Sequence, residues 1–193
     1  MKTILLVVSI AITLVSVLPY MRDILRHKTK PNIVSWITWT MLTGIATAAE
    51  IGAGEYTTAI FTGAATLETS MVVALGVRHG FVKYTRFDIV CQLSAIVGII
   101  LWQLFNSPQL AIIATVTIDF IGALPTLRHS WQMPSEETWQ TYLLGSVASA
   151  FGVLALTQYN LVALSFPLYL TIVNAATALI IVSRRKQHEV NAT

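Results

Sequence analysis

This 193-residue chain has little charge and little cysteine. Charged residues make up 11% of it, against 55% hydrophobic residues, and the mean hydropathy is +0.70. The single cysteine, Cys91, excludes an intrachain disulfide. No His lies within an apolar run, and no Cys/His or Asp/His spacing is typical of a metal site. The sequence therefore predicts no metal, no cofactor and no nucleophile-plus-base constellation of an enzyme.

Seven near-continuous apolar runs predict an all-helical membrane protein. The runs cover 3–21, 33–53, 56–77, 87–106, 108–127, 138–157 and 161–183. Each is close to the ~20 residues that cross ~30 Å of hydrocarbon. They leave no room within the chain for a soluble domain. A signal peptide is the alternative for the first run, but no Ala-x-Ala-type cleavage site follows it.

Lys and Arg are missing from the turns after the second, fourth and sixth runs. Eleven of the twelve lie in the other turns and the tail, and only Lys2 lies on the opposite side. Because loop Lys and Arg stay cytoplasmic during insertion, the N-terminus is predicted outside and the C-terminus in the cytoplasm. The pI near 9.2 reflects residues that flank helices, so we expect a lipid bilayer and no nucleic acid as partner. The compact chain favours a bacterial cytoplasmic membrane.

The chain contains two copies of one unit. Leu18-Pro19-x-x-Arg22 recurs after 106 residues as Leu124-Pro125-x-x-Arg128. A Pro-x4-Trp-x2-aromatic element recurs after 103 residues, with Trp39 and Tyr142 as its last members. The repeat predicts a 3+1+3 arrangement of two parallel halves, 1–86 and 107–193, joined by a linker helix, 87–106. Transporters built from such repeats hold their substrate near the midplane between the halves.

Pro19 and Pro125 lie near the predicted cytoplasmic ends of the first and fifth helices. Each removes one backbone hydrogen bond and frees a carbonyl four residues earlier, on Val15 and Ile121. A paired break in equivalent helices favours a gate that bends. The alternative is that each proline simply ends its helix before a basic loop.

This layout resembles the SWEET and PQ-loop transporter superfamily. The resemblance rests on three helices, a linker and three more, with a Leu-Pro element in helices one and five. Tyr20 and Thr126 stand in place of the Gln of the Pro-Gln pair, and helices two and six lack mid-helix prolines. The family implies alternating access of a small polar solute through a central pathway. One chain holding both halves would suffice as a monomer, and a homo-oligomer remains open.

The resemblance also implies roles for three residues. In sugar carriers of the family, helices three and seven each offer an Asn to the substrate. The matching positions here hold Glu68 and Asn174, again 106 residues apart. Some lysosomal PQ-loop carriers similarly place an acid on helix five for proton coupling, where this chain has Asp119.

Glu68, Asp119 and Asn174 also stand out without the resemblance, because each lies near the middle of an apolar run. A carboxylate at membrane depth costs at least ~2.5–3.5 kcal/mol, so it should face the bundle interior or water. Burial favours the protonated form of an acid, so Asp119 and Glu68 are candidates for proton coupling. The alternative is structural: neutral acids, or an Asn, that join neighbouring helices.

A polar stripe at helical spacing follows the second helix and recurs more weakly on the sixth. Trp39 and Thr43 from the first half, and Tyr142 and Ser146 from the second, are predicted to line the substrate pathway. Trp36 and Trp139, nearer the predicted inner surface, are interpreted as members of the interfacial aromatic belt. The acids at the start of the sixth helix, Glu136 and Glu137, are interpreted as complements to the helix dipole.

The sequence thus predicts a transporter that moves a small polar solute by alternating access, with proton coupling as an added option. The alternative is a non-transporting membrane receptor or assembly partner of the same fold. A carrier requires the polar faces of both halves to meet, whereas a partner-binding protein would turn them towards lipid.

Overall fold

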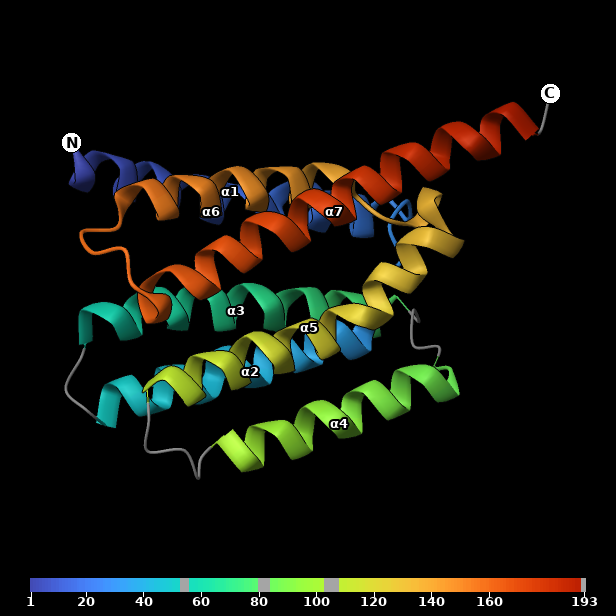
Figure 1. Ribbon diagram of the computed structural model, residues 1–193. Coiled ribbons are helices and arrows are strands. Elements are labelled where there is room, and N and C mark those ends of the chain that lie inside the picture. Colours follow the sequence, from blue (N-terminus) through green and yellow to red (C-terminus); the bar gives the residue numbers. More distant parts are fainter. Residues whose placement is uncertain (53–55, 80–83, 103–107, 192–193) are drawn as a thin grey trace.

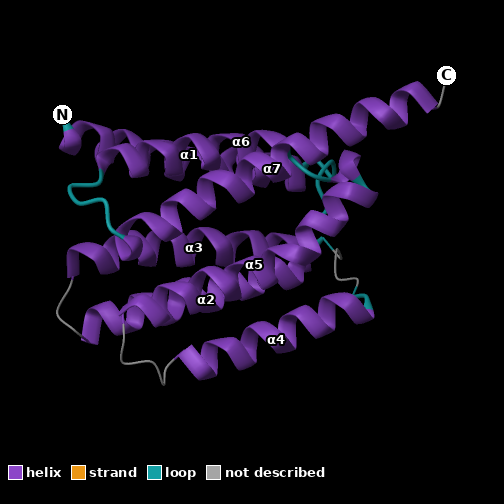
Figure 2. Cartoon of the chain, in the orientation of Figure 1, coloured by secondary structure: helices purple, strands orange, loops and turns teal. Residues whose placement is uncertain are grey.

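The computed structural model describes residues 1–52, 56–79, 84–102 and 108–191. The described residues form seven α-helices and one short 3-10 turn, with no strand among them (Figure 2). The helices are α1 (Lys2–Leu25), α2 (Ile33–Gly52), α3 (Tyr56–Arg78), α4 (Arg86–Trp102), α5 (Pro108–Gln132), α6 (Trp139–Ala155) and α7 (Leu161–Asn191), with the turn η1 (Pro134–Glu136) before α6. The predicted all-helical class is confirmed.

Successive helices run in alternating directions, so the N- and C-termini lie at opposite ends of the molecule (Figure 1). The end that contains the α1–α2 connection, the α5–α6 connection and the C-terminal part of α7 carries most of the described Lys and Arg residues. We call it the basic end. Lys83, which the sequence also predicts at this end, lies outside the described residues.

Three helices of the described part are long and apolar enough to cross a membrane: α1, α5 and α7. In α2 the stretch Ile33–Ala48 is apolar but shorter. Large apolar side chains cover the outside, among them Ile4 on α1, Val90 on α4 and Leu179 on α7. Such an exterior is compatible with a lipid environment and is uncommon on soluble monomers.

The helices pack in a defined set of pairs. α1 packs along α6. Lys2 Nζ donates to the Leu154 carbonyl of α6, and Ser9 Oγ donates to the Ala148 carbonyl, each at 2.8 Å. α2 packs on α3, and α6 packs on α7. α5 lies against α4, α7 and α2, and its contact with α4 centres on Ile118. α1 makes only a small contact with α3.

Buried side chains concentrate towards the basic end. In α1 the buried residues lie between Ser16 and Ile24, and in α7 they are Thr177, Ala178 and Ile181. Those of α2 lie between Ile33 and Thr38. Among the described side chains, the opposite halves of these three helices are half-buried or exposed. In these three helices the buried side chains thus lie in the half nearer the basic end.

Pro19 and Pro125 both lie inside helices. α1 continues past Pro19 to Leu25, and α5 continues past Pro125 to Gln132. The interpretation of these prolines as helix terminators is therefore wrong. Each leaves a position in the helical ladder without an N–H donor, which is a local weak point in the helix.

Candidate functional site

An apolar cluster at the basic end contains residues from both ends of the sequence. Five helices, α1, α2, α3, α6 and α7, contribute to it. We call it the gate cluster, and its buried members are Val17, Tyr20, Ile24, Trp36, Val72, Tyr142, Ala178 and Ile181. Helices distant in sequence meet here, so the cluster forms only when these five helices are assembled.

Aromatic side chains tie the gate cluster together. The Tyr20 and Trp36 rings lie 4.9 Å apart, and Tyr142 meets Tyr20 edge-on at 6.2 Å. The Trp36 indole Nε1 donates to the Tyr20 hydroxyl at 3.2 Å. The hydroxyls of Tyr20 and Tyr142 both donate to Glu137 Oε2, each at 3.0 Å. One carboxyl group thus joins α1 to α6 through two tyrosines.

Glu137 is fully buried, at 0% exposure, in the segment between η1 and α6. Burial raises the pKa of its carboxyl to about 8, and the tyrosine hydroxyls offset part of that rise. Within the described structure, its Oε1 has no hydrogen-bond partner. Arg185 of α7 lies close by, but its hydrogen bonds go to backbone carbonyls. Its Nε donates to the Pro134 carbonyl at 2.8 Å, and its Nη2 donates to the Glu137 carbonyl. The carboxyl is therefore held in a site that favours its neutral form.

The α1–α2 connection is fastened to the segment that precedes α6. Lys30 pairs with Glu136 through its side chain, and its backbone N–H donates to the Glu136 carbonyl at 2.9 Å. The hydroxyls of Thr29 and Thr138 are hydrogen-bonded, and Thr138 also donates to Asp23 Oδ2 at 3.1 Å. These polar contacts join the end of α1 and the α1–α2 connection to the segment before α6.

The residues that follow the two repeat prolines make comparable contacts. Tyr20, after Pro19, reaches the start of α6 at Glu137. Thr126, after Pro125, reaches the start of α2, where its backbone N–H donates to Ser35 Oγ at 3.2 Å. In both cases the residue after the proline contacts the beginning of a helix that is distant in the sequence.

Asp119 of α5 is 8% exposed and joins three helices. The Tyr169 hydroxyl of α7 donates to Asp119 Oδ2 at 2.7 Å. The side chain of Trp39, on α2, lies near the Asp119 carboxyl. Trp39 in turn contacts Trp36 edge-on at 5.0 Å. Two of the predicted site residues, Asp119 and Trp39, are thus brought together beside the gate cluster.

Glu68 and Asn174 each lie one helical turn from the gate cluster, on the side away from the basic end. Glu68 shares its helix face with Val72, and Asn174 shares its face with Ala178. Both polar side chains are half-buried. Asn174 packs against α6 where Gly145 leaves room, because a Cβ at Gly145 would lie 3.4 Å from the Asn174 amide.

The hydroxyls of Thr43 and Ser146 are engaged by backbone carbonyls. Thr43 Oγ1 donates to the Trp39 carbonyl of its own helix at 2.8 Å. Ser146 Oγ donates to the Thr171 carbonyl at 2.9 Å and so joins α6 to α7. Each hydroxyl keeps acceptor capacity, but its proton already has a partner.

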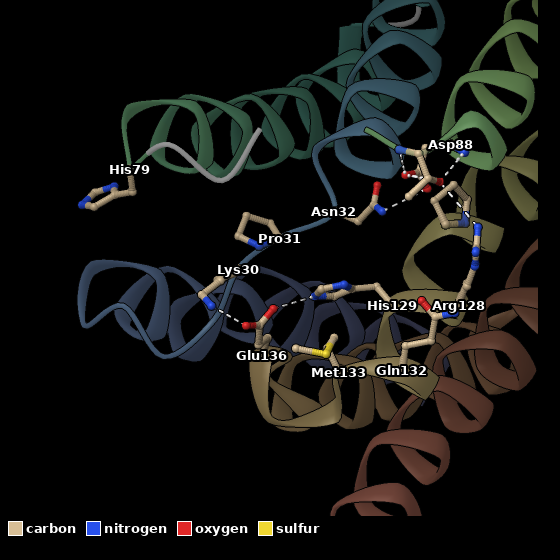
Figure 3. A pocket seen from close by; sticks show the side chains of 12 residues that line it. Lys30, Pro31, Asn32, His79, Asp88, Arg128, His129, Gln132, Met133 and Glu136 are labelled. Carbon is tan, nitrogen blue, oxygen red and sulfur yellow. Dashed lines mark hydrogen bonds and ion pairs between the residues drawn. The ribbon is translucent and has the colours of Figure 1, made fainter. Parts of the chain in front are cut away.

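A pocket of about 470 Å³ lies at the basic end, beside Pro125 and outside the gate cluster (Figure 3). Its wall includes the Lys30–Glu136 pair, and His129 Nε2 lies 3.6 Å from Glu136. On the opposite wall Asp88 accepts from the Thr85 backbone and hydroxyl, at 2.7 and 2.8 Å, which begins α4 with a capping box. Lys30, Glu136 and Asp88 in the wall of the pocket thus already have partners within the protein.

Sequence reasoning missed part of this site. Trp36 is 4% exposed and faces the interior, so its interpretation as a membrane-belt residue is wrong. Glu137 binds two tyrosines instead of only complementing a helix dipole. Tyr169 carried no signal, because an aromatic residue within an apolar run is ordinary. Tyr20 stood out as the residue after the repeat proline, but its partner could not be read from the sequence.

Among the described residues, no group of three His, Cys, Asp or Glu side chains is placed to hold a metal ion. No protein-family model matches this chain, and neither a curated protein nor a solved structure matches it.

Proposed function

We propose that this chain is a membrane carrier that moves a small polar solute by alternating access. The observation that carries the proposal is the gate cluster, a buried set of aromatic and apolar side chains from five helices that lies at the basic end. A carrier must close on one side while it is open on the other, and the polar residues Glu68 and Asn174 lie just beyond the closed end. A receptor or assembly partner has no need of such a closure.

We further propose a 3+1+3 arrangement, with halves at 1–86 and 107–193 around linker 87–106, as in the SWEET and PQ-loop superfamily. Two features support it. The packing of α2 on α3 has its counterpart in α6 on α7, and α1 on α6 has its counterpart in α5 on α2. The contacts made after Pro19 and Pro125 are also equivalent. In this arrangement the prolines are the weak points at which α1 and α5 bend as the gate opens.

In this scheme Asn174 and Glu68 bind the solute, with Trp39, Thr43, Tyr142 and Ser146 lining its path. Asp119 can carry a proton, because its partners Tyr169 and Trp39 lie on helices that move relative to α5 when the gate opens. The basic end faces the cytoplasm of a bacterial cell by the positive-inside rule, which places the N-terminus outside.

Uptake into liposomes tests the proposal. The purified chain would be supplied with radiolabelled sugars, amino acids and vitamins, with and without a pH gradient. We expect uptake of at least one panel member. Asn174→Ala should lower it about tenfold or more, because one substrate hydrogen bond is worth ~1.4 kcal/mol. Asp119→Asn should abolish any dependence on the gradient.

Ile172→Ala is the matched control, because Ile172 lies two residues from Asn174 but is 61% exposed on the outside of α7. It should leave uptake unchanged. If the native protein is folded and no panel member enters the liposomes, the result counts against the carrier and favours the receptor or assembly partner.

A further inference from the structure

Glu137 has features that a purely structural residue does not need. Its carboxyl is fully buried, yet Tyr20 and Tyr142 satisfy only Oε2 and leave Oε1 without a partner in the described structure. An unpartnered carboxylate oxygen in an apolar site is costly, whereas a proton on the carboxyl removes most of that cost. The site is thus built for the protonated acid.

The elements that bury Glu137 are the elements of the gate. Tyr20 comes from α1, Tyr142 from α6 and Arg185 from α7, and Trp36 of α2 holds the Tyr20 hydroxyl. Separating α1 from α6 takes Tyr20 away from the carboxyl, and separating α7 from α6 takes Arg185 away from it. Opening the gate therefore exposes Glu137 to water at the basic end.

We infer that Glu137 is a proton-binding site that couples the gate to the pH at the basic end. When the gate closes, the carboxyl takes one proton from water there, and when the gate opens the proton returns to the same water. This inference rests on the proposed function, because it assumes that the gate opens. It adds a proton site that is separate from Asp119 and faces the basic end.

The sign of the effect follows from linkage. In the closed gate burial raises the pKa of Glu137 from its ordinary value of 4.5 to about 8. The hydroxyls of Tyr142 and Tyr20 and the charge of Arg185 lower it, and Glu136 raises it. Between these two values the closed state binds more protons than the open state. Acid therefore favours the closed gate, and the ratio of open to closed rises at most about tenfold per pH unit in this window.

Distance measurements by electron paramagnetic resonance test the inference without any substrate. Spin labels would be attached at Arg26→Cys and Ser135→Cys, two exposed positions on the fastened connections, in a Cys91→Ser background in lipid nanodiscs. From about pH 5 to about pH 9 the short distance should give way to a longer one. Glu137→Gln, which keeps an acceptor for the tyrosines but cannot titrate, should hold the short distance at every pH.

Two further variants sharpen the result. Tyr20→Phe removes one donor that favours the carboxylate, so the midpoint of the transition should move to higher pH. Glu136→Gln is the matched control: it changes the neighbouring acid, which pairs with Lys30, and should retain the pH dependence. The inference is overturned if the native distances do not change with pH, or if Glu137→Gln changes with pH as the native chain does.

The outcome separates this inference from the carrier. Solute uptake by a chain whose gate ignores pH would overturn the inference alone. A pH-dependent gate in a chain that takes up no panel member would support the inference and count against the carrier.

Discussion

Two buried acids show how single residues are accommodated in this bundle. Asp119 and Glu137 each accept a hydrogen bond from a tyrosine on another helix. Asp119 lies in the middle of an apolar run, so its cost in a membrane could be predicted from the sequence. Glu137 lies beside a loop, where acids are common. Its burial depends on Tyr20, which is remote in the sequence and which no local pattern connects to it.

The Asp119–Tyr169 bond gives a prediction at this scale. Tyr169→Phe removes the hydroxyl that donates to Asp119 at 2.7 Å and leaves the ring in place. Side-chain hydrogen bonds between membrane helices are worth about 1 kcal/mol, so the free energy of unfolding should fall by about that amount. Unfolding by dodecyl sulfate in mixed micelles measures it. Tyr84→Phe, at a 52% exposed residue, serves as control, and an equal loss in both variants would contradict the prediction.

At the scale of elements, the apolar runs predicted where the helices begin more closely than where some of them end. The run at 108–127 becomes a helix that continues to Gln132, and the run at 161–183 becomes one that continues to Asn191. Hydropathy marks the part of a helix that suits lipid, whereas backbone hydrogen bonds carry the helix on into polar sequence. The pairing of helices was not predictable either, because it depends on which small residues meet which side chains.

Gly122 is such a residue, and it sets the approach of α5 to α2. A Cβ at Gly122 would lie 2.6 Å from Thr38 Cγ2. Thr38 cannot turn away freely, because its hydroxyl donates to the Val34 carbonyl and lies 3.1 Å from Gln92 Oε1. Gly122→Ala should therefore destabilise the protein by about 1–3 kcal/mol, as overpacking does.

Thermal unfolding in detergent checks this prediction, with Gly52→Ala as the control, since nothing lies within 4 Å of a Cβ there. Adding Thr38→Ala to Gly122→Ala removes the clashing methyl group and should recover part of the loss. A Gly122→Ala variant as stable as Gly52→Ala would show that α5 and α2 are not held this closely.

At the scale of the whole molecule, the organisation that matters is the contrast between its two ends. The repeat was inferred in part from the two Leu-Pro elements, and both of their prolines lie inside helices. It did not predict at which end the gate cluster would form, because that depends on which distant side chains meet. The packing at the basic end results from contacts between distant segments: the gate cluster, the hydrogen bonds from Tyr20 and Tyr142 to Glu137, and the fastened α1–α2 connection.

Locking this end should stop transport if the chain works by alternating access. The hydroxyls of Thr29 and Thr138 are in contact, so Thr29→Cys with Thr138→Cys in a Cys91→Ser background places two thiols where a disulfide can form. Oxidation should then lower uptake about tenfold or more, because the closed state can no longer interconvert with the open one. Reduction should restore uptake, and Thr29→Cys alone should respond to neither treatment. Unchanged uptake with the disulfide formed would mean that any solute crosses by a path that does not need the basic end to open.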